Sequence, residues 1–242
     1  MRAKKSYGQH FLHDEHICRT IADAILSLDN YDVLVEVGPG KGAITKYLIQ
    51  AERPFYVVEA DRDMVAYLRS NLTELKEDHI IEADFLKVDL RAVFPGKQIA
   101  IVGNFPYNIS SQIVIKVVEC RDVVEHMVGM FQKEMADRVL SGPGSKDYSS
   151  LSVQSAAYYD GRSVINVGPG AFSPPPKVQS TVIALTRRVE PENIKDYKTF
   201  RSVVRAAFNL RRKMLRNSMK AIIGNSEMLS EPLFTKRPEQ LS

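Results

Sequence analysis

The chain has 242 residues, 44% of them hydrophobic, which suffices for one large domain or for one domain with a small appendage. Its net charge of +4 is unevenly spread, since the residues from Arg187 onward hold 13 Lys and Arg against 6 Asp and Glu. A basic segment on a near-neutral body favours a polyanionic partner. The first residues contain no apolar signal segment and no run has membrane-spanning length, so we expect a cytoplasmic protein.

Strands and helices are predicted to alternate through most of the chain. A basic arm with Arg2, Lys4 and Lys5 comes first, and a helical pattern follows from Glu15 to Leu28. Predicted strands lie near residues 33–37, 55–59, 79–83, 99–103, 126–131, 163–167 and 179–185, with predicted helices near 43–51, 61–76 and 110–119. This alternation predicts an α/β fold, in which a mostly parallel sheet has helices on both faces.

A glycine-rich turn from Gly38 to Gly42 follows the first of these buried strands. Glycines allow a ligand to approach the backbone closely, and the helix that follows offers unpaired N–H groups. The spacing is G-x-G-x-G, whereas dinucleotide enzymes have G-x-G-x-x-G, so an NAD-dependent oxidoreductase is a weak alternative.

Polar residues also stand where the next three strands end. Glu59 lies about 20 residues past the glycine turn, the usual place of a ribose-binding acid, and Asp84 and Asn104 follow the third and fourth strands. Each acid alone is typical of a helix cap or a solvated loop. Together they predict a ligand site, because the carboxyl ends of parallel strands meet at one edge of the sheet.

The segment Asn104, Phe105, Pro106, Tyr107 is the most specific feature of the sequence. Taken alone it is also typical of a turn that ends a strand. The amide oxygen of Asn104 and the main-chain carbonyl of Phe105 are two acceptors that suit an exocyclic base amine, and the ring of Tyr107 suits stacking on that base. Pro106 has a fixed φ and biases Phe105 towards an extended conformation, which directs the Phe105 carbonyl outward. This pattern favours methyl transfer to a flipped base.

Segments along nearly the whole chain resemble the ribosomal RNA adenine N6,N6-dimethyltransferases. They are Gly8–Leu12, Glu36–Gly42, Glu59–Asp61, Ala83–Phe85, Asn104–Ser110, Gln132–Ala136, Tyr148–Val153, Phe172–Val178 and Phe208–Lys213. The last two look more like the KsgA (RsmA) type, which acts on small-subunit RNA, than the Erm type, which acts on large-subunit RNA. One departure is Phe105, where the bacterial pattern usually has leucine. The chain also ends at Ser242, where the family pattern opens a final helix, so we expect a shortened form of the protein.

The resemblance implies a Rossmann-like class I methyltransferase sheet, mostly parallel with an antiparallel strand at one end, and a small C-terminal helical domain. The expected domains are 1–188 and 189–242. It also implies that the cofactor is S-adenosylmethionine, with Gln9 and His10 near its methionine moiety, Glu59 on its ribose and Asp84 on its adenine amine. The full cofactor set expected is Gln9, His10, Leu12, Gly38, Gly40, Glu59, Asp84, Phe85 and Asn104. The residues expected to act on the target base are Asn104, Phe105, Pro106, Tyr107 and, as its second stacking face, Phe172.

The substrate that the resemblance implies is a pair of adjacent adenosines near the 3′ end of small-subunit (16S) ribosomal RNA, methylated by a monomeric enzyme during ribosome biogenesis. Two alternatives stay open. One is an Erm-type enzyme that acts on protein-free large-subunit RNA, and the other is an assembly factor that binds RNA but has little turnover.

Beyond Val189 the pattern is helical and basic. The residues Arg201, Arg205, Arg212, Arg216 and Lys220 recur at spacings that would line one helical face, with Asn209 as the N-cap of a second helix. We expect these residues, with Arg2, Lys4 and Lys5, to contact RNA, although an ordinary solvated helix face has the same pattern.

No metal site is expected. His10, His13 and His16 recur every three residues, but no cysteine or acidic cluster completes a tetrahedral set with them. Cys18 and Cys120 have neither metal-binding nor redox spacing.

Overall fold

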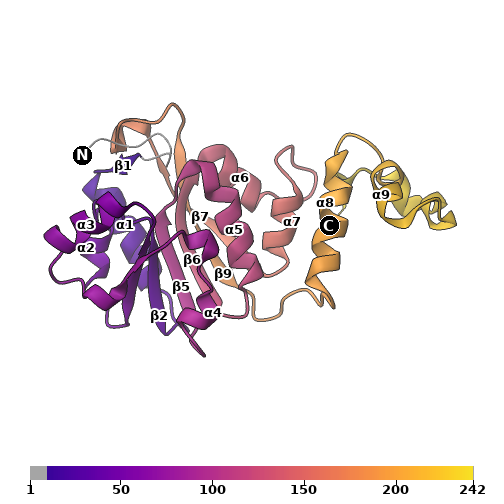
Figure 1. Cartoon of the computed structure of the whole chain (residues 1–242). Helices are drawn as coiled ribbons and strands as arrows, with labels where there is room; N and C mark the ends of the chain where they lie inside the picture. The colour runs from indigo at the N-terminus through magenta and orange to yellow at the C-terminus, as the bar shows by residue number, and fades with distance from the viewer. Residues whose placement is uncertain (1–9, 242) are drawn as a thin grey trace. The chain divides into compact units, whose positions relative to one another are not determined.

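The computed structural model describes residues 10–241 (Figure 1). The expected basic arm with Arg2, Lys4 and Lys5 lies outside the described residues, as does Gln9. The chain divides into two compact units. The first runs to Ala136 and includes Asp160–Arg187, and the second consists of Asp137–Tyr159 and the chain from Arg188 onward.

A seven-stranded sheet forms the first unit, as the α/β prediction required. Its strands are β2 (Val33–Val37), β3 (Phe55–Glu59), β4 (Ile80–Glu82), β5 (Ile99–Asn104), β6 (Val124–Gln132), β7 (Tyr159–Val167) and β9 (Ser180–Arg187). They lie in the order β4-β3-β2-β5-β6-β9-β7, in which β2 to β6 are parallel and β9 is antiparallel to β6. The predicted fold class, a mostly parallel methyltransferase-like sheet with an antiparallel strand towards one end, is confirmed.

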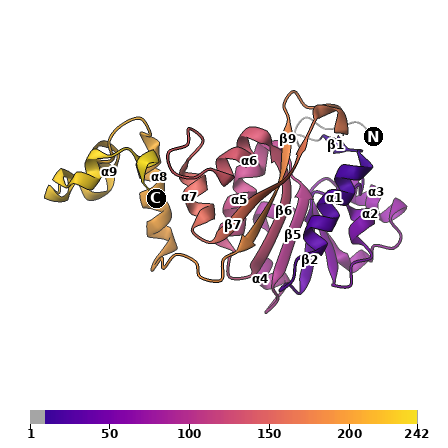
Figure 2. The same cartoon turned by 180° about the vertical axis from the view of Figure 1, so that it is seen from behind.

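Helices cover both faces of this sheet. They are α1 (Glu15–Leu26), α2 (Thr45–Leu48), α3 (Arg62–Asn71), α4 (Leu90–Val93) and α5 (Ser110–Glu119). The helix α5 lies in front of the sheet in Figure 1, and α1 lies in front of the opposite face in Figure 2. Asp14 is the N-cap of helix α1, since its carboxylate accepts the N–H of Ile17. The buried residues of α1 are spaced by three and four and lie on one face.

Two local predictions were too long, and one pairing was missed. The helix expected over 43–51 is only the four-residue α2, whose N-cap Ile44 provides no side-chain hydrogen bond, and α3 ends at Asn71 rather than near 76. A second, two-stranded sheet pairs β1 (Phe11–Leu12) with β8 (Phe172–Ser173) in antiparallel register. Strands of two residues are too short to show a hydrophobic period in the sequence.

The second unit is helical. It contains the second half of α6 (Lys133–Leu140) and all of α7 (Ser150–Ala156), α8 (Tyr197–Asn209) and α9 (Leu215–Ile223). Short 3-10 turns, Glu227–Ser230, Pro232–Thr235 and Pro238–Gln240, follow α9. The expected division into 1–188 and 189–242 therefore needs a correction, because residues 137–159 belong to the second unit. The ring of Tyr148 packs edge-on against Phe208, 5.5 Å between centroids, and joins this insertion to α8.

Asn209 was also assigned wrongly. It is the last residue of α8, and α9 begins after Met214, which makes no side-chain capping bond. Among the described residues, none of the helices is both long and apolar enough to cross a membrane.

Candidate active site

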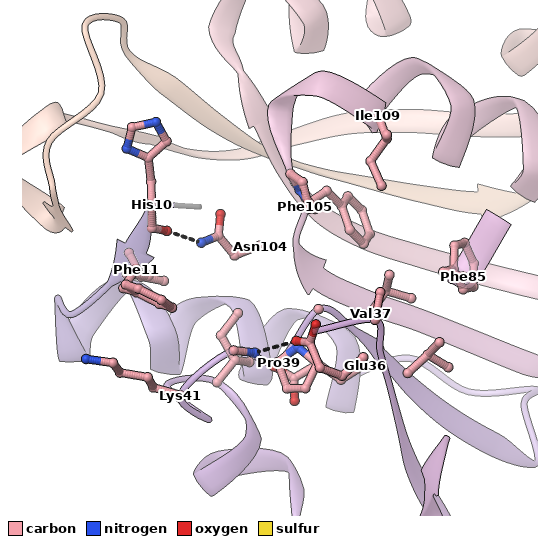
Figure 3. A pocket seen from close by; sticks show the side chains of 18 of the residues that line it. His10, Phe11, Glu36, Val37, Pro39, Lys41, Phe85, Asn104, Phe105 and Ile109 are labelled. Carbon is pink, nitrogen blue, oxygen red and sulfur yellow. Dashed lines mark hydrogen bonds between the residues drawn. The ribbon is translucent and has the colours of Figure 1, made fainter. Parts of the chain in front are cut away.

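A cavity of about 990 Å³ opens at the carboxyl edge of β2, β3, β4 and β5, within the first unit. Its lining includes a residue from each strand end singled out in the sequence, namely Gly38, Glu59, Asp84 and Asn104. The structure thus brings together groups that lie up to 66 residues apart in the chain. Figure 3 shows His10 and Phe11 on one side of this cavity and Phe85 and Ile109 on the other.

The glycine turn brings bare backbone to the cavity. Gly38 and Gly40 have φ values of 68° and 54°, which only glycine adopts at low cost. A Cβ added to Gly40 would lie 3.4 Å from the ring of Phe11, so a larger residue would also narrow the cavity there. The turn is therefore built to let a ligand contact the main chain.

Glu59 is a buried acid with acceptor sites to spare. Its side chain is 7% exposed, and its carboxylate accepts the N–H of Gly40 at 3.2 Å and that of Asp61 at 2.9 Å. Burial raises the pKa of Glu59, and these main-chain bonds oppose that rise. A carboxylate has about four lone-pair positions, so Glu59 can accept a further hydrogen bond from a ligand hydroxyl.

Glu36 lies deeper in the same cavity and was not predicted as a site residue. It is 1% exposed and accepts the hydroxyl of Thr45 at 2.6 Å. Burial raises the pKa of Glu36 to about 8, the Thr45 hydrogen bond opposes the rise, and the charge of Glu59 adds to it. The signal available in the sequence was a charged residue inside an otherwise apolar buried strand.

The Asp84 carboxylate caps a 3-10 turn, Phe85–Lys87, by accepting the N–H of Leu86 at 3.0 Å. Lys116 of α5 holds this turn from outside the cavity. Its ammonium donates to the carbonyls of Leu86 and Val88, at 3.0 and 2.6 Å. Asp84 and Phe85 both line the cavity, and Phe85 is 4% exposed. This anchor was not predicted from the sequence, because a lysine in an amphipathic helix pattern is typical of the solvated face.

The orientation of Asn104 is fixed by a hydrogen bond to the main chain. Its amide nitrogen lies 2.9 Å from the carbonyl oxygen of His10, as the dashed line in Figure 3 marks. A carbonyl only accepts, so the NH₂ group must face His10 and the amide oxygen must face the other way. Asn104 therefore presents an acceptor from a fixed position.

The ring of Tyr107 is held on two sides. It stacks on the imidazole of His10, with centroids 5.4 Å apart and planes 29° from parallel, and its hydroxyl lies 2.7 Å from that of Ser180. Burial raises the pKa of Tyr107. His10 Nδ1 in turn lies 2.8 Å from the Pro174 carbonyl, so Nδ1 carries the proton and donates.

One predicted site residue falls elsewhere. Phe172 is 3% exposed, belongs to the main hydrophobic core and does not line the cavity. Its pairing with Leu12 between β8 and β1 explains the burial, and its role as a second stacking face stays a prediction. Leu12 is 5% exposed and does line the cavity, as do Pro106 and the buried Phe105.

The predicted basic stripe is interrupted. Arg201 and Arg205 lie on α8, Arg216 and Lys220 on α9, and Arg212 in the turn between these helices. Arg201 is half-buried, whereas the other four are exposed. The expected spacing assumed a helical path through residues 210–214 that the chain does not follow.

Comparison with known proteins decides the family. The model of the family described as ribosomal RNA adenine dimethylase matches residues 1–234. The chain belongs to this family. It is 49% identical over 243 residues to a ribosomal RNA small subunit methyltransferase A of Bacteroides thetaiotaomicron, covering 100% of this chain and 90% of that protein. It is 48% identical to the protein of the same name from Flavobacterium johnsoniae, covering 100% and 92%.

Solved structures share its fold. A dimethyladenosine transferase from Plasmodium falciparum matches with a TM-score of 0.80 and 23% identity, over 96% of this chain and 93% of that one. The 23S rRNA methyltransferase ErmE matches with a TM-score of 0.65 and 27% identity, over 95% and 96%.

The family is dependent on S-adenosylmethionine, and the cavity fits this cofactor. Its volume is within the range of small-molecule sites. The bare backbone at Gly38 and Gly40 suits close approach, and the Glu59 carboxylate can accept a further hydrogen bond, as a ribose-binding acid must.

Proposed function

We propose that this chain dimethylates N6 of two adjacent adenosines near the 3′ end of small-subunit ribosomal RNA during subunit biogenesis. The observation that carries the chemistry is the Asn104 amide, whose nitrogen donates to the His10 carbonyl, so that its oxygen faces away from His10 as a fixed acceptor. Near-50% identity over the whole chain to small-subunit methyltransferases supports the choice of RNA.

The residues that would hold the cofactor line the described part of the cavity. Gly38 and Gly40 provide the backbone, Glu59 accepts the ribose hydroxyls, and Asp84 accepts the adenine amine beside Phe85. His10 and Leu12 lie at the methionine end in this proposal. When bound, the cofactor supplies an electrophilic methyl group.

The chain's own residues prepare the nucleophile. The N6 amine is a poor nucleophile because its lone pair is delocalised into the ring. Asn104 Oδ1 and the Phe105 carbonyl would each accept one N–H, which localises the lone pair towards the methyl donor, while the Tyr107 ring stacks on the base. The N6 proton becomes acidic once the nitrogen carries the new methyl, and it can leave to water. An amide rather than a general base therefore suffices at position 104.

The exposed cations of the second unit would hold the RNA. Arg205, Arg212, Arg216 and Lys220 can neutralise phosphates without reading sequence. In this proposal Arg2, Lys4 and Lys5 assist them.

Labelled S-adenosylmethionine and mass spectrometry of RNA nucleosides test the proposal. Small ribosomal particles that lack this modification should gain N6,N6-dimethyladenosine when incubated with the protein, and the Asn104→Ala variant should leave them unmodified. Product on protein-free large-subunit RNA instead would identify an Erm-type enzyme. Particle binding without any product would identify an assembly factor.

A further inference from the structure

We infer that Gly129 is a positioning residue for methyl transfer: its missing side chain makes room for the Phe105 ring, and the seated ring sets the direction of the Phe105 carbonyl. The inference rests on the proposed function, because it concerns the acceptor that Phe105 offers to the target amine.

Two glycines on neighbouring strands lie against the Phe105 ring. Gly103 of β5 and Gly129 of β6 are register partners in the parallel pair, one step before Asn104 and Met130. A Cβ added to Gly129 would lie 2.0, 2.7 and 3.0 Å from Cε2, Cδ2 and Cζ of Phe105. A Cβ added to Gly103 would lie 2.9 Å from Cε1 on the other edge of the same ring. The Phe105 ring therefore lies across both glycines.

A second aromatic ring packs against Phe105. Phe131, which is fully buried on β6, packs edge-on against Phe105 with centroids 5.2 Å apart. Phe105 itself is 1% exposed. Interiors packed at this density transmit a displacement to their neighbours because they contain no free space to absorb it.

The backbone at Phe105 has little freedom to compensate. Pro106 has a fixed φ, and the residue before a proline is restricted to extended conformations. The side chain and the carbonyl of Phe105 depart from adjacent atoms of the same residue, so a forced shift of the ring must turn or move the carbonyl. Displacement of a reacting group by about 1 Å can cost up to about a hundredfold in rate.

Gly129 suits a test better than Gly103. A Cβ on Gly103 would also meet the carbonyl oxygen of Val37 at 2.5 Å, so its replacement disturbs β2 directly. The three atoms nearest to a Cβ on Gly129 all belong to the Phe105 ring. Replacing the Phe105 ring by the smaller leucine side chain should therefore relieve the crowding. If Gly129→Ala instead caused a general packing defect in β6, Phe105→Leu would not relieve it.

The experiment is a double-variant cycle with Gly129→Ala and Phe105→Leu, measured as kcat on small ribosomal particles and as cofactor Kd by calorimetry. Gly129→Ala should lower kcat by about tenfold or more and change cofactor Kd by less than about twofold. In the Phe105→Leu background the same substitution should cost less than about threefold. Gly168→Ala is the matched control, because a Cβ there meets nothing within 4 Å, and it should behave like the parent.

Several outcomes would overturn the inference: an unchanged kcat in Gly129→Ala, an equal loss of kcat and cofactor affinity, or a loss that Phe105→Leu does not relieve. If Gly129→Ala alone does not fold, the double variant decides, since it should fold and transfer methyl groups; a double variant that is also unfolded or inactive counts against the inference. A parent protein without any transfer would refute the proposed function itself, and this inference with it.

Discussion

The side-chain amide of Asn104 donates to the main-chain carbonyl of His10 across 94 residues of sequence. This bond, and not the side chain's own conformational preference, determines which end of the amide faces the cavity. The ring of the same His10 stacks on Tyr107, so one residue of the N-terminal segment contacts both groups assigned to the target base.

Replacement of Asn104 by alanine should therefore remove transfer and leave the cofactor site nearly intact. We expect kcat to fall by about a hundredfold or more, by analogy with the loss of one oriented hydrogen-bonding group from an active site. Asn104→Asp should be comparably impaired, because a carboxylate has no N–H for the His10 carbonyl. Calorimetry should show cofactor Kd within a few fold of the parent. An equal loss of affinity would place Asn104 in the cofactor pocket.

Glu59→Ala should act on cofactor binding instead. The substitution removes the acceptor proposed for two ribose hydroxyls, and it also leaves the N–H groups of Gly40 and Asp61 without their present partner. We expect Kd to rise by about tenfold to a hundredfold. The exposed acid Glu74, changed to alanine, provides a control that should bind as the parent does. An unchanged cofactor affinity in the Glu59 variant would contradict the assignment of Glu59 to the ribose hydroxyls.

At Tyr107 the structure separates two roles, because the ring and the hydroxyl have different partners. Tyr107→Phe should keep most activity, whereas Tyr107→Ala should lose a stacking contribution of about 1–3 kcal/mol. Ser180→Ala removes the partner of the hydroxyl from the other side and is the matched control. A phenylalanine variant as inactive as the alanine variant, with Ser180→Ala active, would show that the hydroxyl itself acts on the substrate.

Features that depend on neighbours in the sequence were predictable. Apolar runs indicate the strands, and the polar residue after each run indicates the edge where Gly38, Glu59, Asp84 and Asn104 meet. Contacts between distant segments were not. The β1–β8 pairing, formed by two residues from each end of the first unit, buries Phe172, although a phenylalanine beside a proline-rich run reads as an exposed loop residue.

Helical periodicity also failed to predict two features that depend on tertiary packing. Lys116 reads as a solvated residue of α5, yet it donates to two carbonyls of the turn beside the cavity. The spacing of the basic residues from Arg201 to Lys220 predicts one continuous helical face, yet the chain turns between Asn209 and Leu215. Neither a lysine's hydrogen-bond partner nor a turn without glycine or proline has a local sequence signal.

The buried Glu36 should make stability depend on pH. Its pKa is about 8 in the folded chain and 4.5 as an unperturbed carboxyl, so the folded state retains a proton that the unfolded state releases. The resulting contribution to the free energy of unfolding is fully present below pH 4.5, declines above it and is lost as pH rises through 8. Thermal unfolding of the parent should show the decline, and Glu36→Gln should flatten it. Thr45→Val, which removes a hydroxyl that favours the charged form, should move the upper end of the window to higher pH. A Glu36→Gln variant with the parent's slope would assign the decline to other groups.

The exposed arginines of the second unit should control RNA affinity through charge. Replacing Arg205, Arg212 and Arg216 together by glutamine should weaken binding to the small ribosomal particle, because phosphate contacts release counterions. Each lost contact should reduce the slope of log affinity against log salt by about 0.7–0.9. Filter binding at several salt concentrations measures this slope, and cofactor affinity should stay unchanged.

A control is needed to separate the effect of net charge from the effect of the arginines' positions in the second unit. Lys76 and Lys97 are exposed cations of the first unit outside the cavity lining, so their double replacement by glutamine should reduce the slope much less than the arginine variant does. Equal effects would mean that the slope follows net charge and not a specific face. If the arginine variant binds as tightly as the parent at every salt concentration, these residues form an ordinary solvated helix face, and the next variants to test would be at Arg2, Lys4 and Lys5.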